Sequence, residues 1–525
     1  MTVPSPPENP PGTAASSGLL RKLAEQSSFS GNVAANYAGR VWEAAMSVAF
    51  VPLYIHHLGS EAYGIIGILA VIQSFMLVLD FGMTPTLTRE AARYQAGEHD
   101  AVHLKDLIRS VEWVIAVVAV LIIGGLALAA PTIAQRWVRA DALSATTIAH
   151  ALTIGGALIA LRFVESVFRG TLYGLQRQLL CNVIAAVFAT LRGVGAIVVI
   201  AWLDGGLGGF FLWQVLISLC IVIALRSGVA LALPQTSRSG HFSREALASI
   251  GRFALGMVAI SVLSLAATQA DKIVLSRLIS LKTFGYYVFA ANVALLLELV
   301  AAPIMTALYP RVVEFVARRD ETGLDDFFHH WAQVITVLTA PAATWLFYFA
   351  PAIILAWSGN PVLAANSGTL LAIIAIGTFL HGQCVLPYYF QLATGWTSLS
   401  IWTNAVALAI MVPSLLLFVP RYGANAGVWT WVAVASVYFF GALNVMFGRM
   451  LPGARWRFYL IDTGLPSAVA FGTMGLLART GLIEPSQPWW LRAALLGVAL
   501  LVTLAVTAGV VFVSRSRLRA RGLEA

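Results

Sequence analysis

The sequence predicts an all-α polytopic membrane protein with about fourteen transmembrane helices. Of its 525 residues 59% are hydrophobic and only 11% are charged, whereas soluble domains carry about 25% charged residues. Apolar runs of roughly 20 residues recur from Val33 to Val513, and a run of that length crosses the ~30 Å hydrocarbon core as a helix. Short polar turns separate the runs, so the chain lacks the polar linkers that divide a soluble protein of this length into domains.

Each apolar run is taken as one membrane span. Periodicity within the runs is weak, as expected where one face of a helix meets lipid and the other meets neighbouring helices. The expected spans are 33–55, 62–84, 110–130, 148–170, 179–202, 208–230, 253–278, 285–308, 331–350, 367–391, 399–419, 424–447, 460–479 and 493–514.

The first residues do not form a signal peptide. Residues 1–18, MTVPSPPENPPGTAASSG, are rich in proline and serine and lack a basic start followed by an apolar stretch. We therefore expect residues 1–29 to form a disordered cytoplasmic tail. The three cysteines all lie inside apolar spans and form no C-x-x-C pair, so they are expected to be packing residues.

Loop charge predicts the orientation. With a cytoplasmic N-terminus, the cytoplasmic segments hold 21 of the 33 Lys and Arg residues, the outer segments hold seven, and five lie within spans. This threefold bias places both termini in the cytoplasm. The net charge of +9 is then explained by topology, and nucleic acid is not an expected partner.

The chain repeats itself weakly at an offset near 221 residues. LGSEAYG (58–64) recurs as ISLKTFG (279–285), and GGLGGFFLW (205–213) recurs as GANAGVWTW (423–431). An offset of six spans gives both copies the same orientation in the membrane. We therefore predict two six-helix bundles, 30–240 and 241–455, related by a pseudo-two-fold axis along the membrane normal, with two extra helices and a basic tail in 456–525.

Several of these stretches resemble one family. Residues 36–94, which contain LGSEAYG and LDFGMTPTLTREAAR, resemble the opening of the polysaccharide-transporter flippases. QADKIVLSRLISLKTFGYYVFA (269–290), PIMTALYPRV (303–312) and YGANAGVWTW (422–431) resemble their second half. This oligosaccharide flippase family belongs to the multidrug/oligosaccharidyl-lipid/polysaccharide (MOP) exporter superfamily, with the multidrug-and-toxin extrusion proteins and the lipid II flippases.

The resemblance implies a V-shaped pair of bundles around a central cavity that works by alternating access. Its substrate would be an undecaprenyl-diphosphate-linked oligosaccharide, such as an O-antigen-type repeat unit, moved across the bacterial inner membrane. The implied partners are this substrate, the bilayer, a polysaccharide polymerase and glycosyltransferases. No cofactor is implied, and coupling to a proton or sodium gradient stays open. The two extra helices either hold the lipid tail or simply face lipid.

An enzyme is not expected. The sequence has no G-x-x-x-x-G-K-[ST] motif. Its histidines show no metal-ligand spacing, and the pairs at 56–57 and 329–330 fall at span ends, where a solvated position is expected. The longest loops are only about 20 residues long, which is short for the carboxylate-rich loops of a membrane glycosyltransferase.

Charges inside the spans are the candidate site residues, because a charged side chain at a helix centre costs about 2.5–3.5 kcal/mol on insertion scales. Arg40 and Glu43 share one face of the first span. Arg162, Glu165 and Arg169 share one face of the fourth. Ion pairs within each helix are the structural alternative, which suits the first span but leaves the fourth with a net positive charge.

Arg192 is the most informative of these residues, because its span contains no acid. Its partner must come from another helix or from the substrate, and Glu165 is the obvious protein candidate. We predict that Arg40, Arg162 and Arg192 contact the diphosphate, with Arg169 at the cytoplasmic mouth of the cavity.

The second half holds Asp271, Lys272 and Glu298 within its spans. Asp271 and Lys272 are expected to point in different directions, because neighbours in a helix do not face each other. Asp271 is either a structural bridge between two helices or a residue of gating or ion coupling. Lys272 and Glu298 are candidates for the same roles.

The first bundle is therefore expected to be positively lined and the second nearly neutral. Arginine binds phosphate oxygens in a bidentate manner, so surplus arginine suits a lipid diphosphate. A multidrug/toxin extrusion-type cation antiporter is the alternative and would need surplus acid and aromatic residues. A membrane scaffold that transports nothing would leave the surplus charge unexplained.

Overall fold

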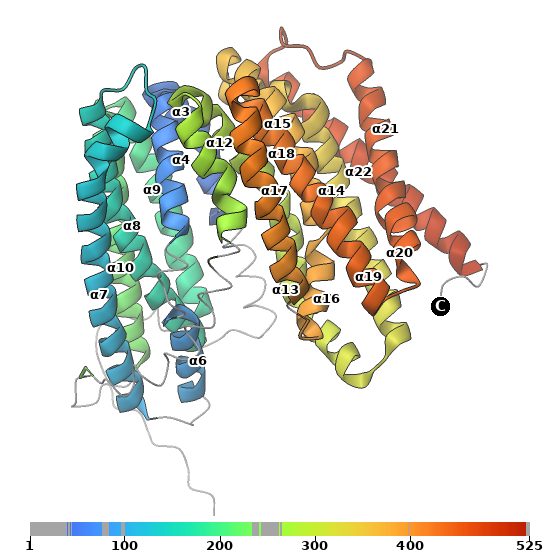
Figure 1. Cartoon of the computed structure of the whole chain (residues 1–525), viewed down its shortest axis with the longest axis horizontal. Coiled ribbons are helices and arrows are strands. Elements are labelled where there is room, and N and C mark those ends of the chain that lie inside the picture. The colour runs from blue at the N-terminus through green and yellow to red at the C-terminus, as the bar shows by residue number, and fades with distance from the viewer. Residues whose placement is uncertain are drawn as a thin grey trace, which may run out of the picture.

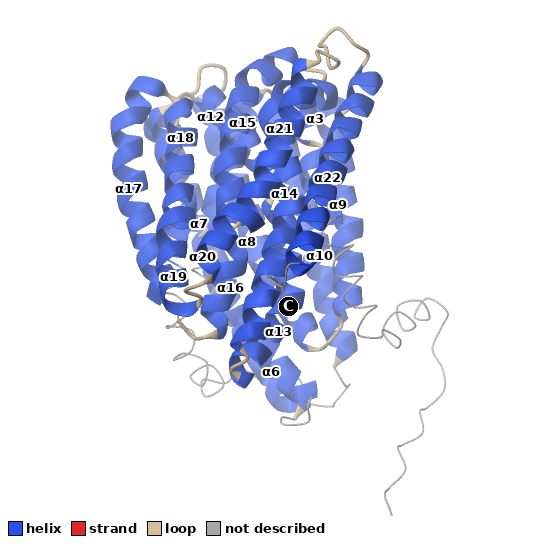
Figure 2. Ribbon diagram, turned by 90° about the vertical axis from the view of Figure 1, so that its right-hand side faces the viewer, coloured by secondary structure: helices blue, strands red, loops and turns tan. Residues whose placement is uncertain are grey.

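The computed structural model describes residues 39, 42–43, 45–75, 83–95, 100–233, 241–242, 262, 265–396 and 398–520. These residues form helices and connecting loops and contain no strand (Figure 2). Ten of the helices are long and apolar enough to cross a membrane, and two shorter apolar helices, Ala45–Leu58 and Ser60–Ser74, accompany them. The predicted number of fourteen stays a prediction, because spans 33–55, 62–84 and 253–278 lie partly outside the described residues, as does the whole tail 1–29.

The described residues of the first half contain eight named helical segments and one short stretch without a name. They are α3 (Val51–Leu58), α4 (Ser60–Ser74), α6 (Met83–Gln95), α7 (Ala101–Thr132), the π-helical η1 (Ile133–Trp137), α8 (Ala145–Gly174), α9 (Gln178–Ala201) and α10 (Gly206–Ala232), with a short helical stretch before α3 at 45–49.

The second half begins with a helix at 265–278. The segments that follow are α12 (Leu281–Leu295), α13 (Glu298–Arg318), α14 (Glu321–Ser358), α15 (Pro361–Gly382), α16 (Val385–Ala393), α17 (Ser398–Tyr422), α18 (Ala424–Ser436), η2 (Val437–Ala442), α19 (Leu443–Met450), α20 (Ala454–Arg457), η3 (Phe458–Gly464), α21 (Leu465–Arg479) and α22 (Trp489–Ala520).

Polar side chains fix where several of these helices begin. Ser144 and Ser280 accept the backbone N–H groups of Thr147 and Thr283 at the starts of α8 and α12. Asp320 caps α14 in the same manner, and Asn360 caps α15 just before Pro361. These caps satisfy N–H groups that have no partner within the helix.

The structure divides two of the predicted spans. The predicted span 285–308 is broken at Leu296–Leu297, between α12 and α13. The predicted span 367–391 is broken between α15 and α16, at Gln383–Cys384. The first break contains neither Gly nor Pro, the residues that usually mark a helix interruption in a sequence, whereas Gly382 stands directly before the second break. Each break has a polar side chain beside it: Glu298 follows the first, and His381 precedes the second.

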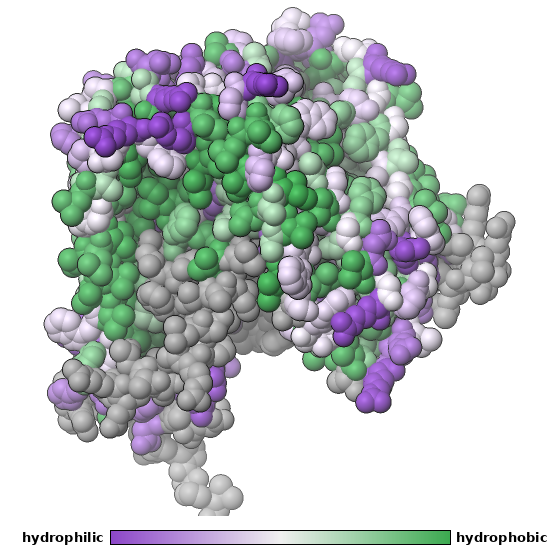
Figure 3. Space-filling view, viewed as in Figure 1, coloured by the Kyte–Doolittle hydropathy of each residue, from purple (hydrophilic) through white to green (hydrophobic). Residues whose placement is uncertain are grey.

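The helices lie in two groups that meet at one end (Figure 1). Helices α7, α8 and α10 pack together in the first half, and α14, α15, α18 and α22 pack together in the second. Helices α4 and α12 lie between the groups and contact each other. Hydrophobic residues form a band across the molecule, and hydrophilic residues gather at its ends (Figure 3), as a bilayer requires.

Close contact between α4 and α12 depends on two glycines. A Cβ atom added at Gly64 would lie 2.7 Å from the carbonyl oxygen of Leu281, and one added at Gly285 would lie 2.1 Å from that of Ser60. The contact is reciprocal, because residues 60 and 64 correspond to 281 and 285 at the offset of 221. Such a self-complementary contact is the signature of a two-fold axis, and it supports the repeat read from the sequence.

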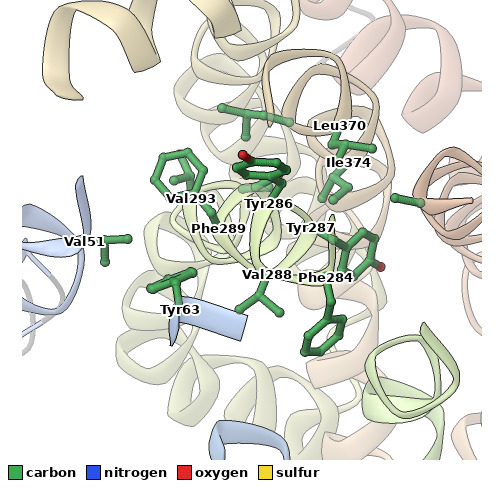
Figure 4. Close-up of a cluster of buried hydrophobic side chains, with 14 of the residues drawn as sticks. Val51, Tyr63, Phe284, Tyr286, Tyr287, Val288, Phe289, Val293, Leu370 and Ile374 are labelled. Carbon is green, nitrogen blue, oxygen red and sulfur yellow. The ribbon is translucent and has the colours of Figure 1, made fainter. Parts of the chain in front are cut away.

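Apolar side chains extend this contact. Tyr63 of α4 lies beside Val288 and Phe289 of α12 in one continuous buried cluster (Figure 4). Val51 of α3 belongs to the same cluster, which continues into α15 through Leu370. The contact lies at the end of α4 near Gly59, which the predicted topology places on the outer side. The two groups of helices are thus joined at the predicted outer end.

Candidate functional site

Helix α8 carries three of the predicted site residues on one face. Arg162, Glu165 and Arg169 are spaced by three and four residues, which places them one above another along the helix. Glu165 is buried, with 8% of its surface exposed, whereas both arginines are only partly buried. Buried carboxylates need partners, and these come from the neighbouring helix α9.

Arg192 of α9 is that partner. Its guanidinium nitrogen NH2 lies 3.5 Å from Glu165 Oε1 and donates a hydrogen bond to Ser218 Oγ of α10 at 3.0 Å. The prediction that Glu165 pairs with Arg192 is therefore confirmed. One guanidinium links three helices, α8, α9 and α10.

Arg169 pairs across helices as well. Its NH1 group lies 3.2 Å from Glu43 Oε1, on the segment that precedes α3. The structural alternative, an ion pair of Glu43 with Arg40 within one helix, is not tested by this contact. Arg40 itself lies outside the described residues, so its predicted place beside the diphosphate stays a prediction.

Arg162 differs from the other two arginines because its partner is neutral. Its NH1 group donates to the amide oxygen of Gln73 on α4 at 2.7 Å. Its Nε group is buried and finds no acceptor among the described residues. Within the part of the chain that is described, no carboxylate lies within 4 Å of this guanidinium.

The described cluster therefore carries three guanidiniums against two carboxylates. Arg169 and Arg192 are matched by Glu43 and Glu165, and Arg162 supplies the surplus positive charge. An unmatched cation in a half-buried position among membrane helices is costly. It is the arrangement expected of a site that receives an anion.

The acid of the LGSEAYG motif has a structural role. Glu61 is buried and accepts backbone N–H groups from Asp141, Ala142 and Leu143 at 2.9–3.0 Å. This carboxylate fixes the loop after η1 against α4. The motif therefore serves the closed end of the molecule, and Glu61 was not among the predicted site residues.

In the second half, Asp271 joins two helices. Its Oδ2 atom accepts a hydrogen bond of 2.6 Å from Tyr287 of α12. Its Oδ1 atom lies 3.9 Å from the Lys272 ammonium, at the outer limit of an ion pair. Asp271 is thus bonded more closely to Tyr287 than to the lysine, which supports the role of a bridge between two helices.

Glu298 pairs with a residue that the sequence analysis did not select. Its Oε1 atom lies 2.8 Å from His381 Nδ1 at the end of α15. The imidazole lies between the rings of Trp431 and Tyr438, with ring centroids 5.4 and 5.2 Å away. Glu298 starts α13 immediately after one helix break, and His381 precedes the other. Both breaks thus bring polar groups into the same cluster.

His329 also departs from its expected solvated position. It is 1% exposed and its Nδ1 atom bonds Asp462 Oδ2, while Gln333 Nε2 donates to Asp462 Oδ1 at 2.7 Å. Asp462 lies in η3 and is fully buried. His330 likewise contacts Arg515 of α22. These bonds tie the appended helices to α14.

The remaining histidine pair agrees with the prediction, since His56 and His57 are exposed at the end of α3. Among the described residues, no group of three or more His, Cys, Asp or Glu side chains could hold a metal ion. The polar chemistry of these helices consists of ion pairs and neutral hydrogen bonds. The arginine cluster of the first half brings surplus positive charge together on neighbouring helices, whereas the buried guanidinium of Arg492 is held by backbone carbonyls of the loop before α22.

The described residues thus form a polytopic helical bundle with charges buried between its helices, and comparisons with known proteins show its family. The chain belongs to the polysaccharide biosynthesis protein family, which matches residues 30–316. It is 24% identical over 343 residues to the succinoglycan biosynthesis transport protein ExoT of Rhizobium meliloti (strain 1021). The alignment covers 63% of this chain and 65% of that relative.

Solved structures show the same fold. The lipid II flippase MurJ in an inward closed conformation superposes with a TM-score of 0.66 at 12% identity, covering 90% of this chain and 97% of that one. A multidrug resistance MATE transporter of the MOP superfamily, inward-facing, gives 0.63 at 15% identity, covering 77% and 95%. The chain thus has the same fold as these two solved structures, and its long apolar helices make it a multi-pass membrane protein.

Proposed function

We propose that the protein is a flippase that moves an undecaprenyl-diphosphate-linked oligosaccharide across the bacterial inner membrane. The observation that carries this proposal is the surplus guanidinium of Arg162, whose described partner is the neutral Gln73. The family of polysaccharide biosynthesis proteins supplies the class of substrate. The structural similarity to a lipid II flippase supports the proposal, because that fold is used by a protein that flips a lipid.

The diphosphate is assigned to the first half. A diphosphate is a compact anion with several oxygens, and arginine offers a planar fork of N–H donors that matches it. Arg162 and Arg192 would bind the diphosphate oxygens, and Arg40 would join them. Arg169, paired with Glu43, would lie at the cytoplasmic mouth. Arrival of the anion would neutralise the surplus charge that the described carboxylates leave.

The contact between α4 and α12 suggests which side is closed. The two halves meet around Gly64 and Gly285, at the predicted outer end. With both termini in the cytoplasm, the substrate would enter from the cytoplasmic leaflet. Separation of α4 from α12 would then release it outward. Asp271, Lys272 and Glu298 remain our candidates for gating or ion coupling during this change.

The alternative function is export of organic cations, since a MATE transporter has nearly the same TM-score. A cation site would need surplus acid. The arginine cluster has the opposite balance. In the second half Asp271 lies beside Lys272, and Glu298 and Asp462 bond the imidazoles of His381 and His329. The charge balance therefore favours an anionic substrate.

Deletion of the gene tests the proposed function. We expect loss of the surface polysaccharide, with accumulation of undecaprenyl-linked oligosaccharide in the inner membrane, and unchanged susceptibility to cationic drugs. Complementation with the wild-type gene should restore the polysaccharide, and a variant carrying Arg162→Ala should not. Normal polysaccharide together with raised drug susceptibility would overturn the proposal in favour of the cation antiporter.

A further inference from the structure

A groove lies on the first group of helices, away from the arginine cluster. It has a volume of about 350 Å³, which falls in the range of ligand pockets, roughly 300–1,000 Å³. Helices α7, α8 and α10 form its walls. It is lined by Arg109, Glu112, Trp113, Ile115, Ala116, Val164, Phe168, Val222 and Arg226.

Two arginines and one glutamate form one end of the groove. Arg109 NH1 lies 2.7 Å from Glu112 Oε2, and Arg226 Nε lies 3.2 Å from Glu112 Oε1. The side chains of Arg109 and Arg226 are 45% and 60% exposed. One carboxylate therefore holds two guanidiniums at the groove, and the three groups together carry a net charge of +1.

The depth of these charges matches the headgroup region of a bilayer. Arg109 follows the start of α7 at Ala101, and Arg226 precedes the end of α10 at Ala232. The predicted topology places both helix ends at the cytoplasmic surface. Trp113 lies one turn, about 6 Å, further in and is 55% exposed. Tryptophan at this depth is typical of a membrane interface.

The rest of the groove is apolar and reaches the helix that carries the candidate site. Ile115 and Ala116 come from α7, and Val222 comes from α10. Val164 and Phe168 come from α8, where Arg162, Glu165 and Arg169 occupy another face. A ligand in this groove would therefore pack against the side of α8 next to the one that presents the arginine cluster.

We propose that this groove binds an anionic phospholipid of the cytoplasmic leaflet. Its phosphate would lie between Arg109 and Arg226, and one acyl chain would follow the apolar lining. A phosphodiester carries one negative charge and matches the net charge of +1, whereas a zwitterionic headgroup offers no net charge to balance. Basic pockets between membrane helices on the cytoplasmic side bind such headgroups in this manner. By packing against Val164 and Phe168, the bound lipid would restrict the movement of α8.

A second cluster of the same composition provides a control. Arg311 and Arg318 both contact Glu314, at 3.3 and 2.7 Å, at the cytoplasmic end of α13. All three residues lie on a single helix and are not among the residues that line the groove. This cluster has the charge of the proposed site without its apolar walls, so it reports non-specific attraction of anionic lipid.

Lipid binding by the purified full-length protein tests the proposal, with phosphatidylglycerol as the probe and phosphatidylcholine as the reference. We expect the Arg109→Gln/Arg226→Gln variant to bind phosphatidylglycerol about tenfold more weakly, because two charge-assisted hydrogen bonds are lost. Ala116→Trp, which fills the groove and keeps every charge, should have a similar effect. Arg311→Gln/Arg318→Gln should bind as the wild type does.

Three results would overturn the proposal. The first is wild-type binding by both groove variants, at matched yield and with single-peak elution. The second is an equal loss in the Arg311/Arg318 control, which would show diffuse electrostatic attraction. The third is displacement of phosphatidylglycerol by undecaprenyl phosphate at equal concentration, which would show that the groove binds a polyprenyl chain and not a phospholipid. None of these results depends on whether the protein flips an oligosaccharide.

Discussion

The two halves of the molecule differ in the balance of their buried charges. In the first half three arginines meet two glutamates, and Arg162 is left with a neutral partner. In the second half three described acids each lie beside a basic side chain: Asp271 beside Lys272, Glu298 beside His381, and Asp462 beside His329. The two predicted bundles therefore differ in charge: the first suits an anion, and the second is close to neutral.

Packing shows where the copies stayed alike. Gly64 and Gly285 occupy equivalent positions and make equivalent contacts between α4 and α12. Trp213 and Trp431 are also equivalent in sequence, yet Trp213 donates to Leu191 O of α9, whereas Trp431 donates to Thr378 of α15. The packing of α7, α8 and α10 is repeated by α14, α15 and α18, so the two halves share their helix arrangement and differ in this side-chain contact.

Replacement of Arg192 should have the largest effect on transport. Arg192→Ala removes a cation that links α8, α9 and α10 through Glu165 and Ser218. We expect transport to be abolished while the protein still inserts. Arg192→Lys keeps the charge but loses the planar fork, so partial transport should remain. Transport of lipid-linked oligosaccharide in proteoliposomes provides the measurement.

The matched control for this experiment is Arg421→Ala. Arg421 lies in the last turn of α17 and is exposed, so its loss should leave transport unchanged. Normal transport by Arg192→Ala at wild-type protein levels would remove Arg192 from the proposed diphosphate site. The pair that it forms with Glu165 would then be purely structural.

The ion pairs of the first half could be predicted from the sequence better than those of the second half. The pairing of Arg192 with Glu165 followed from the sequence, because a lone cation in an apolar span requires an acid nearby. His381 and His329 were missed because their partners lie 83 and 133 residues away, on helices whose contact no local spacing reveals. The signal that could have found them is that each His has an intramembrane acid within the same half.

The helix breaks could not be predicted from the sequence either, for the same reason. Leu296 and Leu297 interrupt a long apolar run, and nothing in their residue types marks the interruption. Tertiary contacts place Glu298 beside His381 at this point, so the polar pair and the break occur together. The fold class and the repeat depend on composition and periodicity, which a single sequence contains. Pairing between distant helices does not leave such a pattern.

Asp462 should affect stability rather than substrate binding. Asp462→Asn removes the charge that His329 and Gln333 share in a fully buried position. Loss of one partner from a buried pair costs about 3–5 kcal/mol, so the apparent melting temperature in detergent should fall clearly.

Asp325→Asn is the matched control for this change. Asp325 lies 3.6 Å from the other ring nitrogen of His329 but is 38% exposed, and exposed pairs contribute about 1 kcal/mol or less. Its variant should melt near the wild-type temperature. If Asp462→Asn lost as much lipid diphosphate binding as Arg192→Ala, the claim that only the first half binds the diphosphate would be contradicted.

The contact between the halves should be sensitive to one methyl group. A Cβ at Gly285 would lie 2.1 Å from the Ser60 carbonyl oxygen, so Gly285→Ala must push α12 away from α4, at a cost of about 1–3 kcal/mol. We expect a lower melting temperature. Gly124→Ala is the control, because no atom lies within 4 Å of its added Cβ, and it should melt at or above the wild-type temperature. Equal melting of both variants would contradict the closed contact.

Binding of undecaprenyl diphosphate to Arg162 variants tests the central claim most directly. Arg162→Gln removes the surplus charge of the cluster while Glu43 and Glu165 keep their own partners. The affinity of the purified protein for the lipid diphosphate should fall by about tenfold, which corresponds to ~1.4 kcal/mol. Arg162→Lys should fall between this variant and the wild type. Unchanged affinity in Arg162→Gln, with normal elution and melting, would contradict the assignment of the diphosphate to the first half.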